Sequence, residues 1–182
     1  IDIQTGKSVE NSSGSVLLKT GESAVASSVD ISIAVGESKS VGGQLVFQGG
    51  DSQDSRGGDI SVRSGSGKIG GSLTIEGGEG LVDGGNIQIQ SGKSLEGTSG
   101  TITLRSGEGN MSGSIELSTS DVVGGQSGDI SIQTGNTGSG KAGSLILGTG
   151  MSETGEGGSF HVQSGVIALQ SGPESPLSLV SS

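Results

Sequence analysis

Apolar side chains return along this chain at a regular interval, in short runs that alternate with polar residues. The repeating unit reads glycine, any residue, aliphatic, any, aliphatic, any, serine or threonine, glycine, as in residues 58–65 and 128–135. Its first apolar position is occupied by Ile1, Val16, Ile31, Leu45, Ile60, Leu73, Ile87, Ile102, Ile115, Ile130, Leu145 and Phe160. These residues lie 13 to 15 positions apart, so the sequence contains twelve repeats of about 14 residues.

Within each unit the apolar positions follow a period of two. Ile31, Ile33 and Val35 fall on one face of an extended chain, and Ile102 and Leu104 do so in a later repeat. This alternation predicts a half-buried β-strand in every repeat. Glycines before and after each run suit tight corners and predict where the strands end.

The second half of the unit keeps one position small. That position is held by Ser23, Ser38, Ser52, Gly67, Gly80, Ser94, Gly109 and Ser152. A solvated loop has no reason to keep one position small, so the pattern predicts a second short strand with a small inward residue. It also predicts that a serine hydroxyl there bonds to a backbone group at the corner.

These patterns together predict an all-β fold, a narrow parallel β-solenoid (β-helix) of about 12 coils with about 14 residues per coil. Residues 1–165 form the expected repeat array, and residues 166–182 form an irregular last coil and a C-terminal cap or tail. Pro173 and Pro176 end the regular ladder, because proline has no backbone N–H to donate. An antiparallel meander is the alternative, but it leaves one apolar face uncovered. The pattern leaves the handedness of the coil open.

Composition narrows the class of protein. Of 182 residues, 39 are glycine and only 1% are aromatic, which excludes a thick core and leaves a thin repeat architecture or a disordered linker. The strict periodicity favours the repeat architecture. Cysteine is absent, and the net charge of −10 argues against nucleic acid as a partner. No apolar run approaches the ~20 residues that a membrane span needs. The chain begins at Ile1 within an apparent strand, from which we expect a processed or truncated start.

The repeat unit at residues 57–67, with its relatives at 84–94 and 127–135, resembles the Gly/Ser-rich repeat arrays of large secreted proteins in diatoms and related stramenopile algae. The resemblance covers essentially the whole chain at the level of the repeat. It implies an extracellular or cell-surface location and surface polysaccharide as a partner. It carries no catalytic residues onto this chain.

Few side chains are candidates for a catalytic or metal-binding role. His161 is the only histidine, and without cysteine it cannot complete a usual zinc site, so we interpret it as an exposed surface residue. Asp30, Asp59 and Asp129 each precede a strand, where they could bind calcium or accept backbone N–H groups at a turn; the second interpretation is favoured. We expect no catalytic residue, no metal site and no cofactor.

The carboxylates and arginines that a carbohydrate-active enzyme would need do not recur at matched positions. Glu76, Arg63 and Arg105 are scattered along the array, so we expect no enzymatic activity.

Two Asn-x-Ser sequons, at Asn11 and Asn110, are candidate N-glycosylation sites in corner segments. The expected function is that of an extracellular structural repeat protein, a subunit of a filament, a surface layer or an adhesive fibre that associates with itself end to end or laterally. The end-to-end mode follows from the open ends of a solenoid, whose backbone groups are unpaired. The alternatives are an ice-binding and a glycan-binding β-solenoid.

Overall fold

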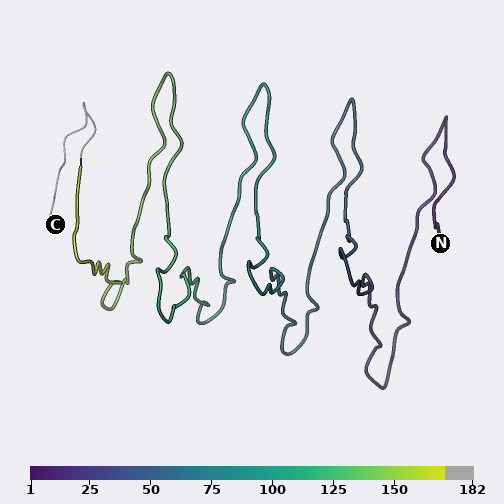
Figure 1. Cartoon of the computed structure of the whole chain (residues 1–182), viewed down its shortest axis with the longest axis horizontal. Helices are drawn as coiled ribbons and strands as arrows, with labels where there is room; N and C mark the ends of the chain where they lie inside the picture. Colours follow the sequence, from purple (N-terminus) through teal and green to yellow (C-terminus); the bar gives the residue numbers. More distant parts are fainter. Residues whose placement is uncertain (171–182) are drawn as a thin grey trace. The chain divides into compact units, whose positions relative to one another are not determined.

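The computed structural model describes residues 1–170, and this part of the chain contains no α-helix and no β-strand. Figure 1 shows it as an unbroken backbone trace of extended runs and sharp turns. The prediction of an all-β, narrow parallel β-solenoid is therefore wrong. The extended runs exist, but no ladder of backbone hydrogen bonds joins one run to the next among the described residues.

One short bend lies between each repeat and the next. The bends lie at 9–11, 24–26, 39–41, 53–55, 67–69, 81–83, 95–97, 109–111, 123–125, 138–140 and 153–155. They follow one another at intervals of 14 or 15 positions, close to the 13 to 15 positions of the aliphatic pattern. The regular feature of the structure is therefore a bend in the polar half of each repeat, where the sequence predicted a second strand.

The chain divides into two units, Ile1–Ile89 and Gln90–Ser182. The first unit contains the six bends from 9–11 to 81–83, and the described part of the second contains the five from 95–97 to 153–155. Both units are thus built from the same local element, an extended run followed by a bend.

Five of the bends are closed at their base by a backbone hydrogen bond between two glycines, which we call the neck of the bend. The amides of Gly58, Gly71, Gly85, Gly100 and Gly158 donate to the carbonyls of Gly50, Gly65, Gly78, Gly92 and Gly150, at 2.8 to 2.9 Å. The glycine that closes one repeat therefore meets the glycine that opens the next. At each neck the chain reverses locally, which a continuous coil of parallel strands does not do.

The solenoid prediction also placed the aliphatic side chains inside a narrow, dry interior. None of the described residues is buried, and the large apolar side chains with the lowest exposure, Val35 and Leu45, still expose 47% of their surface. The half-buried residues are small ones, Thr5, Thr20, Gly49, Ser64, Ser91, Ser94 and Ser106. The most covered part of the chain is thus the base of the bends.

The prediction of an irregular last coil and cap concerns residues 166–182. Of these, residues 171–182, with Pro173 and Pro176, lie outside the described part of the chain. The last described feature is a local turn, in which the Ser164 hydroxyl donates to the Val166 carbonyl and lies 3.2 Å from the Val166 amide.

Candidate functional site

The bends are the recurring built feature of the molecule, and the residue immediately before each bend, the pre-bend position, governs how the bend is held. In chain order this position is occupied by Ser8, Ser23, Ser38, Ser52, Ser66, Gly80, Ser94, Glu108, Val122, Thr137 and Ser152. Eight of these eleven residues carry a hydroxyl group.

Five serine hydroxyls accept a hydrogen bond from the backbone amide three residues later. The pairs are Ser8 with Asn11, Ser23 with Ala26, Ser52 with Ser55, Ser94 with Gly97, and Ser152 with Gly155, at 2.8 to 3.1 Å. We call these five the hydroxyl-closed bends. A serine side chain supplies an acceptor that the chain does not offer there, so the turn needs no backbone partner. The prediction that corner serines bond to the backbone is confirmed.

Two further hydroxyls accept a hydrogen bond from the backbone amide two residues later. Ser38 Oγ accepts from the Ser40 amide at 3.1 Å, and Thr137 Oγ1 accepts from the Ser139 amide at 3.3 Å. The Thr137 bend also contains Gly140, whose φ of +90° is a conformation that favours glycine.

Three bends depend on glycine instead of a hydroxyl, and we call them the glycine bends: 67–69, 81–83 and 109–111. A Cβ atom on Gly80 would overlap the Asp83 carbonyl oxygen, and Cβ atoms on Gly67 and Gly109 would lie 3.1 Å from the carbonyl oxygens of Ile69 and Met111. In these bends a backbone carbonyl lies over the glycine Cα. Glycine is therefore needed for space at position 80, and at positions 67 and 109 a larger residue would crowd the carbonyl.

At the necks, too, backbone atoms lie so near the glycines that little room is left for a Cβ atom. A Cβ atom on Gly49 would lie 2.5 Å from the Gly58 carbonyl oxygen, and one on Gly85 would lie 2.8 Å from the Gly78 amide nitrogen. In repeats without a glycine pair, the side chain of Thr5 or Thr134 faces the opposite glycine, with Thr134 Oγ1 donating to the Gly143 carbonyl at 3.3 Å. The residue before the closing glycine of the repeat unit, a Ser, Thr or Gly, thus lies at the base of these bends.

Between the bends lie the aliphatic segments, which carry the alternating Ile, Leu and Val residues of each repeat. Ile60, Ile102 and Ile130 expose half or more of their surface, and the other repeats are similar. Burying one such side chain contributes about 1.5–3 kcal/mol. Each aliphatic segment is therefore a surface that a partner can stabilise.

The residues singled out for chemistry are not brought together. His161 is exposed beside Phe160, and no hydrogen bond reaches the carboxylates of Asp30 and Asp129 within residues 1–170. For Asp59 the prediction of a backbone partner is wrong, because its carboxylate accepts two bonds from Arg56 Nη2, at 2.7 and 2.8 Å. Both side chains are largely exposed.

Across the described residues there is no group of three or more histidine, aspartate or glutamate side chains that could hold a metal ion. Nor do these residues form a pocket. Glu76, Arg63 and Arg105 are exposed residues in separate repeats. None of the described segments is a helix of the length and apolar character needed to cross a membrane.

Both sequons fall on bends. Asn11 is the last residue of the hydroxyl-closed bend 9–11, where its amide donates to Ser8, and Asn110 is the middle residue of the glycine bend 109–111. Both asparagines are exposed. Their glycosylation stays a prediction.

Sequence reasoning missed the Arg56–Asp59 ion pair, although the spacing of three residues was a signal for it. It also missed the bend 123–125, which has Val122 in the pre-bend position and two glycines with positive φ, Gly124 at 78° and Gly125 at 122°. The Gly-Gly dipeptide was the available signal.

Comparison with known proteins adds no identification. No protein-family model, curated protein or solved structure matches this chain.

Proposed function

We propose that this chain is an extracellular, non-enzymatic structural protein, a subunit of a filament, surface layer or adhesive fibre, which works by associating with further copies of itself through its aliphatic segments. The observation that carries the proposal is the exposure of these segments in every described repeat. An end-to-end mode of assembly has lost its basis, because it needed the open end of a solenoid. The same correction removes the β-solenoid on which the ice-binding and glycan-binding alternatives depended.

The amount of exposed surface supports association. The chain exposes 19224 Å², whereas a compact folded chain of 17.6 kDa exposes roughly 7,900 Å². The excess is several times the roughly 1,200–2,000 Å² that a stable protein–protein interface buries. Since ordering a chain is opposed by conformational entropy, apolar contacts with a partner are the available stabilising term.

Repetition favours a copy of the same chain as the partner. A second copy offers aliphatic segments at the same intervals, separated by bends of the same size. A catalytic site, by contrast, depends on a unique set of side chains, and this chain repeats one motif throughout. The extracellular location rests on the resemblance of the repeat unit and on the two sequons.

Sedimentation velocity over a range of protein concentrations tests the proposal. We expect the wild-type chain to associate as concentration rises, and the variant Ile60→Asn/Val62→Asn to have a dissociation constant at least about tenfold higher, because two buried aliphatic side chains are lost. Ser61→Asn, between the two, is the matched control and should behave as wild type. A wild-type chain that stays monomeric at every concentration would refute the proposal.

Secretion is tested separately. When the chain is expressed through a eukaryotic secretory pathway, we expect a mass increase that peptide N-glycosidase removes. The variants Asn11→Gln and Asn110→Gln should each abolish one glycan. A secreted chain without glycans would remove the sequons as support for the extracellular location.

A further inference from the structure

One aliphatic segment, residues 58–65, has a neck at each of its ends. The Gly58 amide donates the hydrogen bond of one neck, and the Gly65 carbonyl accepts that of the next. The whole segment lies within the unit Ile1–Ile89. Between the necks, the amides and carbonyls of residues 59–64 make no hydrogen bond to another backbone group among the described residues. An extended run with unpaired backbone groups is a template on which a second chain can pair.

The side chains of this segment are arranged symmetrically about Ser61. Ile60 and Val62 lie one position to either side of it, and Asp59 and Arg63 lie two positions away. If a second copy runs antiparallel with Ser61 opposite Ser61, Ile60 of one copy falls opposite Val62 of the other. Asp59 falls opposite Arg63 in the same way. Because side chains alternate along an extended chain, the four aliphatic residues share one face of the pair.

The charges of the segment select the antiparallel direction. Opposite charges directly across a pair of strands stabilise it, and like charges destabilise it. A parallel, in-register copy would place Asp59 opposite Asp59 and Arg63 opposite Arg63. Among the described residues Arg63 makes no ion pair, and the ion pair between Arg56 and Asp59 is largely exposed. Asp59 and Arg63 are therefore both accessible to a charge of opposite sign on a second copy.

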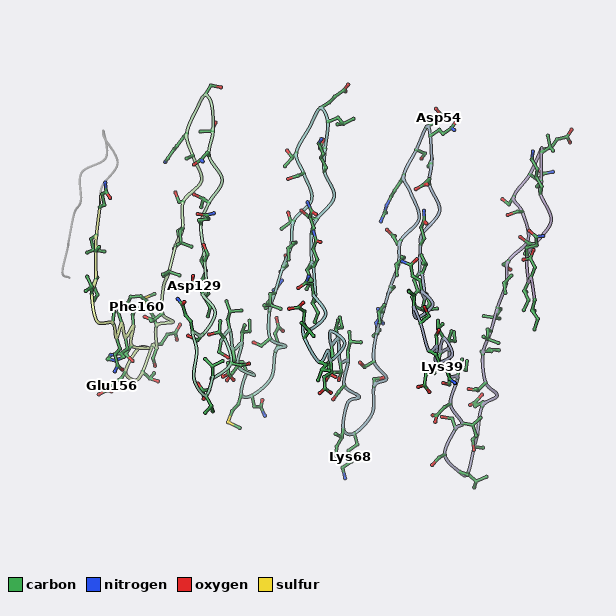
Figure 2. All side chains as sticks on the ribbon, in the orientation of Figure 1. Lys39, Asp54, Lys68, Asp129, Glu156 and Phe160 are labelled. Carbon is green, nitrogen blue, oxygen red and sulfur yellow. The ribbon has the colours of Figure 1, made fainter. Side chains whose placement is uncertain are left out.

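The bends on either side follow the same symmetry. The central residues of bends 53–55 and 67–69, Asp54 and Lys68, lie at equal distances from Ser61. Figure 2 shows Asp54 and Lys68 at the turning points at the two ends of this run. In the antiparallel pair Asp54 of one copy falls opposite Lys68 of the other. A further pair of opposite charges therefore lies at each end.

In no other repeat do opposite charges flank the aliphatic pair in this way. The repeat 128–135 has the same Asp-Ile-Ser-Ile order, but Gln133 stands in the place of the arginine. The repeat 100–107 has Arg105, but Thr101 stands in the place of the aspartate. These two repeats keep the aliphatic pair without the charge complementarity, so they serve as internal controls.

We infer that two copies of the chain pair antiparallel through residues 58–65, with Ser61 on the two-fold axis. The inference rests on the proposed self-association and assigns its register at this repeat. The interface is isologous, because each copy contributes the same residues to it. Hydrogen bonds between the two runs use backbone groups of residues 59–64 that the single chain leaves without a backbone partner.

Cysteine cross-linking between full-length chains tests the direction of the pair, because the protein has no cysteine of its own. Gly57 and Gly65 fall opposite each other in this register, and a Cβ atom on either meets at most an ordinary contact. Cα atoms across an antiparallel pair lie about 4.5–5.5 Å apart, which a disulfide can span. Isotopically distinct copies carrying Gly57→Cys and Gly65→Cys, mixed and oxidised mildly, should give at least about fivefold more mixed disulfide than either homodimer. A parallel pair would give the two homodimers instead.

The matched control uses the repeat without the arginine. Ser127→Cys and Gly135→Cys hold the same places about Ser131 as the first two variants hold about Ser61. Their mixture should give no more mixed disulfide than random encounter produces. An equal excess in the control would show that the charges do not select residues 58–65, and would overturn the inference.

Charge reversal gives an independent readout by sedimentation velocity. Two cross-strand charge pairs change a dissociation constant by about twofold to thirtyfold. We expect Arg63→Asp to raise the dissociation constant at least about fivefold, because an aspartate then faces Asp59. The exchange Asp59→Arg/Arg63→Asp should return it to within about twofold of wild type, because opposite charges again face each other. Arg105→Asp, at the equivalent position of a repeat with Thr101 opposite, is the control and should stay near wild type.

The outcomes separate this inference from the proposed function. If the chain associates but the homodimers of Gly57→Cys and Gly65→Cys dominate, the antiparallel register is wrong and self-association stands. The same holds if Arg63→Asp and Arg105→Asp weaken association equally, or if the exchange variant does not recover. If the wild-type chain does not associate, both proposals are wrong.

Discussion

The bends 81–83 and 95–97 lie in consecutive repeats, and the residue before each bend holds the turn in a different way. Both are closed at the neck by a glycine–glycine hydrogen bond, from Gly85 to Gly78 and from Gly100 to Gly92. Before the first bend Gly80 leaves room for the Asp83 carbonyl, whereas before the second the Ser94 hydroxyl accepts the Gly97 amide at 2.8 Å.

The comparison teaches that serine and glycine are not interchangeable at these two pre-bend positions, Gly80 and Ser94. A hydroxyl-closed bend needs an acceptor, and a glycine bend needs an empty space. Figure 2 shows Asp54 at the tip of a bend of the first kind, with Ser52 as its acceptor, and Lys68 in a bend of the second kind. Substitutions at these positions should therefore have effects that differ in size and in cause.

The largest effect is expected for Gly80→Val. Its Cβ would overlap the Asp83 carbonyl oxygen, so the bend must open and the Gly85 N–H must lose its partner. Amide hydrogen exchange at Gly85, measured by NMR in dilute solution, should speed up about tenfold or more. Gly70→Val is the matched control, since no atom lies within 4 Å of its Cβ. Unchanged exchange at Gly85 would show that the glycine bend does not depend on space.

Gly124→Ala and Gly125→Ala should have the next largest effect. Both glycines have positive φ, and an L-residue in that conformation costs about 1–2 kcal/mol. The three-bond HN–Hα couplings of residues 123–125 should shift toward values for negative φ. Gly128→Ala should leave them unchanged, because its Cβ would make only an ordinary contact with Thr119 at 3.6 Å.

Ser94→Ala is expected to have a smaller effect. It removes one exposed hydrogen bond, which contributes about 0.5–1.5 kcal/mol. Exchange of the Gly97 amide should speed up about twofold to tenfold, and Ser94→Thr should keep the wild-type rate because the hydroxyl is retained. Equal rates in the alanine and threonine variants would contradict a role for the Ser94 hydroxyl.

The smallest effect is expected for Ser66→Ala, which tests the difference between the two kinds of bend most closely. Ser66 occupies the pre-bend position of the glycine bend 67–69, where the Ile69 carbonyl lies over Gly67. Ser66→Ala should therefore leave amide exchange at Ile69 and Gly71 as in the wild type, although the same substitution at Ser94 does not leave its bend unchanged. Faster exchange in Ser66→Ala would show that the hydroxyl-closed and the glycine bends do not differ in how they are held.

The bends could be predicted from the sequence better than the extended runs. The serine or glycine that precedes most of the bends acts over three residues or fewer, so a local pattern fixes its partner, and the hydrogen bonds of Ser23 and Ser52 follow from it. The strand prediction for segments such as Ile31–Val35 needed a neighbour far away in the chain. Alternation shows which side chains share a face but not what covers that face. The small residues assigned to a second strand serve the bends instead.

The candidate functional residues, too, could be predicted only in part. The two sequons were placed correctly on corner segments, because asparagine and serine are local turn formers. The partner of Asp59 was not, because a turn carboxylate can accept from a backbone amide or from a nearby arginine, and the sequence does not rank the two. The bend series itself became visible only with the structure.

The central claim is that a single chain forms its bends but leaves its aliphatic segments uncovered until another copy binds them. Carbene footprinting with mass spectrometry, across a range of protein concentrations, measures this directly. We expect strong labelling of Ile60, Ile102 and Ile130 in dilute solution, and protection of all three as concentration rises, with little change at the bends. Protection of these isoleucines in the dilute monomer would contradict the account, because it would mean that the chain already covers them by itself.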